Sequence, residues 1–269
     1  MRKFYLKFDM KIQKVILVFY FIVFSYTDIY SMCGRERISV LPESRKISLN
    51  SIIVVEGYAD SQEIINELGR NYPIYLKHGK HKIKLLVKEI LKGQFNLNQA
   101  ILVPESNLQL KKKYRLFIEN LPKGEELKRW NIDLGKFEPI EYEVEDLNDS
   151  ISPVFKTIPK EIKKSYTAYG CGPEMKVVFE FKIIEENEFL VKATMKDQTT
   201  GKEVKYYLKP QNDKLEIGHG MCSGAFLYGE SYNYEIEFSL IDFSGNVTPW
   251  IGDRIIFTRP TTFDSVRKP

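Results

Sequence analysis

The chain has 269 residues, of which 40 are Lys or Arg and 36 are Asp or Glu. Five of the basic and two of the acidic residues lie in residues 1–31, so the remainder carries a net charge of +1, from 35 basic and 34 acidic residues. This balance excludes the basic stripe that a nucleic-acid-binding protein needs.

The N-terminus carries the pattern of an export signal. Lys11 and Lys14 precede an unbroken apolar run from Val15 to Phe24, and a short, more polar stretch ends at Ser31. A basic segment, an apolar core of this length and a small residue at its end are typical of a cleaved signal peptide. We therefore expect residues 1–31 to be removed and the protein to be periplasmic or extracellular, where disulfides persist.

Two alternatives for the N-terminus stay open. The apolar run could be retained as an anchor, although a spanning helix needs about 20 apolar residues. Cys33 could be lipidated, but Met32 stands directly before it, where a lipoprotein signal has a small residue. Cleavage after Ser31, with Cys33 left in the mature chain, is the prediction. No later stretch is apolar enough to span a membrane, so we expect no transmembrane span in the mature chain.

Short alternating segments between turn residues predict strands through the first half of the chain. These segments are residues 37–40, 52–56, 74–76, 83–90, 100–103, 114–118 and 140–144. One short helix is also expected, with Ser61 as its cap and Ile64, Ile65 and Leu68 on its apolar face before Gly69.

The second half repeats the β pattern after an acidic stretch that ends in a Ser-Pro pair. Its expected strands are residues 175–183, 189–195, 204–208, 232–240 and 250–258, with a turn at 242–246. Strands at this spacing without βαβ units are typical of sandwiches of about 100 residues each. We predict an all-β protein with two immunoglobulin-like β-sandwich domains, at residues 32–148 and 158–260. A linker at 149–157 joins them, and a tail covers 261–269.

The first half resembles the bacterial immunoglobulin-like domains of surface-layer and other envelope proteins. The residues that carry the resemblance are Leu41-Pro42, the strand Ile47–Val54, and Leu102-Val103-Pro104-Glu105 followed by Leu108, Leu110 and Lys113–Leu116. The similarity covers about residues 36–148, and Ile241–Asn246 resembles the turn before the last strand of many such repeats. The resemblance implies structural or adhesive roles in the cell envelope, and it implies no catalytic residues.

Three cysteines, at positions 33, 171 and 222, invite a pairing in an oxidising compartment. Cys171 and Cys222 lie in the same half of the chain beside glycines that let backbones approach closely, and we predict a structural disulfide between them. An alternative is a metal-binding or redox protein, in which His219, Met221 and Cys222 would supply soft ligands to copper. A disulfide would remove the Cys222 thiolate, so we predict neither a metal nor another cofactor.

Tyrosines concentrate in the second half and suggest a further alternative, a glycan-binding accessory module. A row of exposed tyrosines could form a sugar platform, although aromatic residues are also common in half-buried strands. The tyrosines concerned are Tyr166, Tyr169, Tyr206, Tyr207, Tyr228, Tyr232 and Tyr234.

Motifs of catalysis are missing from the sequence. It contains no Gly-x-Ser-x-Gly elbow and no glycine-rich phosphate loop, and three histidines leave few groups for acid–base chemistry. We therefore expect that the protein is not an enzyme. The sequence favours an exported envelope protein that binds an unidentified protein or glycan partner, or that serves as a structural module.

Overall fold

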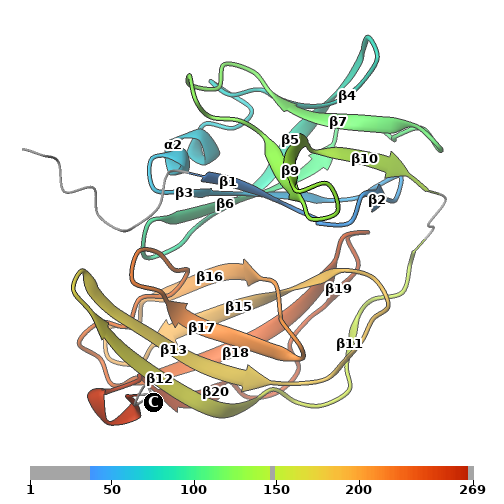
Figure 1. Cartoon of the computed structure of the whole chain (residues 1–269). Coiled ribbons are helices and arrows are strands. Elements are labelled where there is room, and N and C mark those ends of the chain that lie inside the picture. Colours follow the sequence, from blue (N-terminus) through green and yellow to red (C-terminus); the bar gives the residue numbers. More distant parts are fainter. Residues whose placement is uncertain (1–36, 146–148, 266–269) are drawn as a thin grey trace, which may run out of the picture. The chain divides into compact units, whose positions relative to one another are not determined.

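The computed structural model describes residues 37–145 and 149–265 (Figure 1). The predicted signal peptide and Cys33 lie outside the described residues. Within the described ranges, no helix is both long and apolar enough to cross a membrane. The described residues belong to one compact unit.

Strands dominate both halves, so the all-β prediction is confirmed. The first half contains β1 (Arg37–Leu41), β2 (Lys46–Ile47), β3 (Ile53–Tyr58), α2 (Ser61–Asn66), β4 (Ile74–His78), β5 (His81–Lys92), β6 (Leu97–Pro104), β7 (Lys113–Ile118), β8 (Lys128–Asn131), β9 (Lys136–Pro139) and β10 (Glu141–Val144). The second half contains β11 (Val154–Phe155), β12 (Lys160–Tyr169), β13 (Gly172–Glu180), β14 (Ile183–Ile184), β15 (Phe189–Asp197), β16 (Glu203–Leu208), β17 (Lys214–His219), β18 (Asn233–Asp242), β19 (Val247–Thr248), β20 (Ile255–Thr258) and a 3-10 turn η1 (Thr262–Asp264).

In the first half, the long strand β5 connects two sheets. Residues 81–84 of β5 pair with β4, and residues 85–92 pair with β6, with an irregularity between Val87 and Glu89 inside that pairing. The sheets β1-β3-β6-β5 and β5-β4-β7-β10-β2 therefore share this strand. The two sheets pack face to face around one apolar core. We call these layers the N-terminal sandwich.

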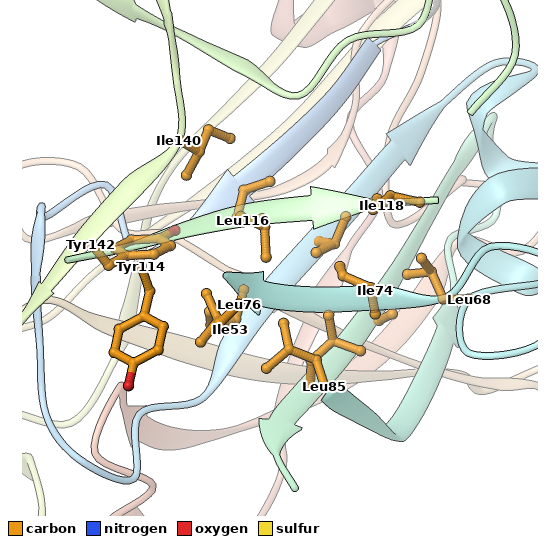
Figure 2. Close-up of a cluster of buried hydrophobic side chains, with 14 of the residues drawn as sticks. Ile53, Leu68, Ile74, Leu76, Leu85, Tyr114, Leu116, Ile118, Ile140 and Tyr142 are labelled. Atoms are coloured by element: carbon orange, nitrogen blue, oxygen red, sulfur yellow. The ribbon is translucent and has the colours of Figure 1, made fainter. Parts of the chain in front are cut away.

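The core of the N-terminal sandwich lies between its two sheets. Alternate residues of each strand point into this core, because side chains alternate between the two faces of a strand. Leu68, from the loop after α2, packs into the same cluster (Figure 2). Fully or almost fully buried members include Ile53, Ile74, Leu76, Leu85, Tyr114, Leu116, Ile118, Ile140 and Tyr142.

The predicted helix is present, but its cap differs from the prediction. Asp60 precedes the helix as N-cap and makes no capping hydrogen bond, and Ser61 is the first helical residue. The Ser61 hydroxyl instead donates to Oε1 of Glu125 at 2.7 Å, because Ser61 is buried and its hydroxyl needs a partner there.

The second half forms another pair of layers, the C-terminal sandwich. The sheet β12-β13-β17 faces the sheet β16-β15-β18, which β19 and β20 extend. Aromatic rings fill the space between them: Phe179 of β13 and Phe238 of β18 are both buried, with ring centroids 5.2 Å apart. Edge-to-face pairs of this kind contribute about 0.5–1.5 kcal/mol beyond their buried area.

A third apolar cluster joins the two sandwiches. Ile52, Val54 and Ile101 point away from the N-terminal core and pack with Leu190, Ile241 and Phe243 of the second half. The unbroken apolar run Ile52–Val55 is buried throughout because one face enters the core and the other enters this cluster.

Polar groups complete the contact between the sandwiches. The Glu188 carboxylate accepts hydrogen bonds from the backbone N–H groups of Glu43 and Ser44 at 2.9–3.0 Å. Glu56 is half-buried and accepts a 2.9 Å hydrogen bond from the Tyr206 hydroxyl. Burial raises the pKa of Glu56, against the opposing effect of this hydrogen bond.

The linker residues that the structure describes lie against the C-terminal sandwich. Asn187 Nδ2 donates to Asp149 Oδ2, and Asn246 Nδ2 donates to the Asp149 backbone carbonyl, both at 3.0 Å. Strand β11, within the predicted linker, pairs with β14. Separate folding of the two halves stays a prediction.

Candidate binding surface

The hairpin of β8 and β9 forms a two-stranded sheet of its own, apart from the sheets of the N-terminal sandwich. Its register places Trp130 opposite Phe137 and Arg129 opposite Glu138. Residues opposite each other in a pair of strands share a face, and neighbours along a strand alternate. The hairpin therefore has one face with Arg129 and Glu138 and another with Trp130 and Phe137.

The face with Arg129 is tied to the N-terminal sandwich. The Arg129 guanidinium donates to the backbone carbonyls of Val40, Pro42 and Glu43, each at 2.8 Å, and lies 5.9 Å from the Tyr142 ring centroid. A planar guanidinium can serve several acceptors at once, which a lysine ammonium does less well. An isolated two-stranded hairpin is marginally stable in water, so this anchor holds it in place.

Glu138 completes the polar network of the same face. Its Oε2 accepts a 2.7 Å hydrogen bond from Asn131 Nδ2 and lies 3.2 Å from Arg45 Nη2. The hydrogen bond from Asn131, supported by Lys136 and Arg45, lowers the pKa of Glu138. The carboxylate is therefore ionised at neutral pH and keeps the network intact.

The opposite face of the hairpin and its turn expose four large apolar side chains. Trp130 and Phe137 are 52% and 54% exposed, and their ring centroids are 5.1 Å apart. In the turn, Ile132 and Leu134 are 83% and 57% exposed. Folding alone tends to bury apolar side chains, yet these four stay exposed while Arg129, on the other face, is held against the sandwich. Exposed apolar side chains gathered on one hairpin make it a candidate interaction site. We call these four residues the hairpin patch.

Sequence reasoning missed this hairpin, although a signal was present. Trp130, Ile132 and Leu134 alternate with polar residues before Gly135, which is the pattern of a strand running into a turn. Gly135 takes a left-handed backbone angle, with φ of 59°. The pattern does not reveal which face of the hairpin packs against the N-terminal sandwich.

The predicted bond between Cys171 and Cys222 is wrong. Cys171 is a free, exposed thiol in the turn between β12 and β13, while Cys222 is disulfide-bonded. The register explains the separation: β13 pairs with β17 from Met175 onward, so the hairpin tip that carries Cys171 extends past the end of β17. The loop after β17 turns instead toward the N-terminal sandwich, where Asn96 Nδ2 donates to the Cys222 carbonyl at 3.1 Å.

Peptide mapping should show this difference between the two cysteines. We expect a maleimide to label Cys171 in the native protein, and Cys222 only after reduction. Cys171→Ser should change the free energy of unfolding by less than about 0.5 kcal/mol, as at other exposed positions. Cys222→Ser should lower it by about 2–5 kcal/mol through loss of the disulfide. Labelling of Cys222 without reductant would contradict this assignment.

The alternative metal residues do not form a ligand set. His219 is the last residue of β17 and is buried; its Nδ1 lies 2.9 Å from the Gly220 carbonyl oxygen. Met221 and Cys222 lie in the following loop, and the Cys222 sulfur is oxidised, which removes the thiolate that would bind copper. Within residues 37–145 and 149–265, no three His, Cys, Asp or Glu side chains are grouped as a metal site requires.

The tyrosines of the second half do not form a row on the surface. Tyr206, Tyr228 and Tyr234 are core residues, with at most 6% of each exposed. The Tyr228 hydroxyl donates to the Ile217 carbonyl, and burial raises the pKa of Tyr228 well above its usual range. Tyr169 and Tyr232 are exposed, at 42% and 54%. The three buried tyrosines therefore cannot take part in a sugar platform, because the strands direct them into the core. A glycan-binding role of the other tyrosines stays a prediction.

Comparisons with known proteins give weak similarity. No family model matches the chain, and no curated protein matches it. Solved structures with some likeness include a pullulanase from Anoxybacillus sp. LM18-11 in complex with maltotriose, at 10% identity and a TM-score of 0.24, over 80% of this chain and 25% of that one.

Two further solved structures show similarly weak likeness. The FN1–FN3 domains of chicken CNTN1 show 8% identity and a TM-score of 0.26, over 82% of this chain and 64% of that one. The Yersinia pseudotuberculosis adhesin InvE shows 10% identity and a TM-score of 0.22, over 83% of this chain and 58% of that one. The chain thus spans about a quarter of the pullulanase and about 60% of the other two. These values assign neither a family nor a role.

Proposed function

We propose that this chain is an exported, non-catalytic binding module of the cell envelope, and that its hairpin patch contacts another protein. The observation that supports this proposal is the orientation of the β8–β9 hairpin. Arg129 and Glu138 attach one face of the hairpin to the sandwich, while Trp130 and Phe137 on the other face stay exposed. Export is supported by the basic and apolar N-terminal pattern that ends at Ser31.

The chemistry of the patch favours a protein partner over a lipid surface. Asp133 lies in the hairpin turn between Ile132 and Leu134, and it is exposed. Inserting this turn into a bilayer would bury its carboxylate, which is costly for an ionised group. A protein surface can leave Asp133 at the rim while it covers the apolar side chains, as interfaces commonly do.

The shape of the patch also differs from a sugar platform. The planes of the Trp130 and Phe137 rings are inclined by 68° to each other, and the other two members are aliphatic. The four side chains of the hairpin patch form an uneven apolar protrusion, which suits a pocket on a partner protein. Tryptophan is among the residues that contribute most to protein interfaces, so Trp130 is the expected centre of the contact.

Removing the two rings of the patch should abolish partner binding and leave the fold intact. We expect wild-type protein to capture an envelope protein of its source organism, and the double variant Trp130→Ala/Phe137→Ala to bind that purified partner at least about 100-fold more weakly, since two interface anchors are lost. The measurement is biolayer interferometry, with melting curves to show unchanged stability.

Phe263→Ala is the matched control, because Phe263 is 98% exposed and lies outside the hairpin. This variant should bind like wild type. Equal binding by the double variant would reject the hairpin patch as the contact. Binding to protein-free liposomes of envelope lipids would instead indicate a membrane surface.

A further inference from the structure

A cavity of about 340 Å³ lies on the face of the sheet β16-β15-β18 that is turned toward the N-terminal sandwich, and its lining includes Tyr207 and Trp250. The strand register builds one wall of it. Tyr207 of β16, Lys192 of β15 and Ser239 of β18 are direct neighbours across three adjacent strands, so their side chains stand in one row. Their neighbours Tyr206, Ala193 and Phe238 point the other way, into the core. We call this feature the sheet-face cavity.

The polar groups of the sheet-face cavity are held in fixed positions. Lys192 Nζ lies 3.3 Å from both carboxylate oxygens of Glu89 and 5.0 Å from the Tyr207 ring centroid. Glu237, also in the lining, accepts a 3.0 Å hydrogen bond from Nε of Arg254. Side chains fixed in this way lose little entropy when a ligand binds.

The aromatic wall is equally well supported. The Trp250 ring makes edge-to-face contacts with Phe155 and Phe238, at centroid distances of 6.0 and 6.1 Å. Its indole Nε1 donates to the Asp253 carbonyl at 3.3 Å. One side of the ring thus packs on the core, which fixes its orientation, and the ring lines the cavity together with Val247 of β19 and Pro249.

Charge pairing narrows the class of ligand. Lys192 is paired with Glu89. Glu237 shares Arg254 with Glu203 and Glu235, and Lys205 and Lys196 pair with those two carboxylates in turn, so this network of three acidic and three basic side chains is balanced. The cavity therefore favours neither an anion nor a cation. The groups that a ligand can contact are the Lys192 ammonium as a donor, the Glu237 carboxylate as an acceptor, and the Ser239 hydroxyl, which both donates and accepts. Two aromatic rings lie beside them. A neutral sugar matches this set, because its ring presents apolar C–H groups and its rim presents hydroxyls.

We infer that the sheet-face cavity binds a neutral saccharide of one or two units, with Tyr207 and Trp250 contacting the sugar ring and Lys192, Glu237 and Ser239 bonding its hydroxyls. The cavity is at the lower end of the range of about 300–1,000 Å³ that is typical of ligand pockets, which sets the size of the ligand. The site uses no residue of the hairpin patch and stands independently of the proposed protein contact.

The test is isothermal titration of the mature chain with three neutral disaccharides: maltose, cellobiose and N,N′-diacetylchitobiose. At least one should bind saturably. Ser239→Leu places a bulky side chain in the middle of the row and should weaken that binding at least tenfold. Glu237→Gln keeps the shape of the cavity but removes the carboxylate, and it should also weaken sugar binding. If circular dichroism shows that Ser239→Leu misfolds, the affinity of Glu237→Gln provides the test instead.

Trp130→Ala/Phe137→Ala is the control and should bind the sugar like wild type, because the hairpin patch takes no part in this site. Saturable binding that both cavity variants retain unchanged would place the sugar elsewhere and overturn the inference. Failure of all three disaccharides to bind would also overturn it. Neither result would bear on the hairpin patch, since the two experiments use different ligands.

Discussion

Replacing Gly218 by alanine should lower the free energy of unfolding by roughly 2–6 kcal/mol. A Cβ atom at this position would lie 2.0 Å from the backbone oxygen of Met175, on the neighbouring strand β13. Gly218 also has a φ of 141°, which residues with a side chain rarely adopt. Backbone strain of this kind costs about 1–3 kcal/mol, and forced overpacking costs about 1–3 kcal/mol more. Urea unfolding followed by tryptophan fluorescence measures the change.

Gly229→Ala is the matched control for this substitution. Gly229 lies in the same sandwich, and a Cβ atom there would meet nothing within 4 Å. The free energy of unfolding of Gly229→Ala should stay within about 0.5 kcal/mol of the wild-type value, as at most surface positions. If Gly218→Ala were as stable as Gly229→Ala, the close approach of β17 to β13 at this point would be wrong.

Replacing Arg129 by alanine should release the β8–β9 hairpin and lower the free energy of unfolding by about 2–3 kcal/mol. Three backbone carbonyls lose a charged donor at once, and a hydrogen bond to a charged group contributes about 1.5–3 kcal/mol on average. Arg129→Lys should recover little of the lost free energy of unfolding, because an ammonium cannot reach the three acceptors with the geometry of a guanidinium. Chemical denaturation gives the energy.

Limited proteolysis reports on the hairpin itself. In Arg129→Ala, cleavage between residues 128 and 139 should become the first event, because a released two-stranded hairpin does not hold its shape. Lys128→Ala is the control: Lys128 is exposed, and its ion pair with Glu126 is a surface pair worth about 0–1 kcal/mol. Cleavage of both variants at the same rate and site would show that Arg129 does not hold the hairpin.

The local pattern of the sequence was sufficient for the fold class. Period-2 alternation depends on the geometry of a single strand, so segments such as 114–118 and 189–195 could be predicted without knowledge of their partners. The turn at 242–246 was equally readable, and the structure confirms it through the Asp242 side chain, which accepts hydrogen bonds from the backbone of Ser244 and Asn246.

Strand pairing decided the features that the sequence left open. Cys171 and Cys222 both lie beside glycines, but the register of β13 and β17 carries their loops in different directions. Tyr206 and Tyr207 are neighbours in the sequence, yet one is buried in the core and the other lines the sheet-face cavity. Such positions depend on contacts between residues far apart in the chain, which a local pattern does not contain.

The sequence by itself therefore determined that this protein is built from strands, where most of them run, and that its N-terminus resembles an export signal. Only the tertiary structure decided which face of each strand is covered. Alternation makes two faces chemically different but does not say which one meets the core. The β8–β9 hairpin shows the consequence, because Arg129 turns its polar face inward and leaves Trp130 and Phe137 exposed.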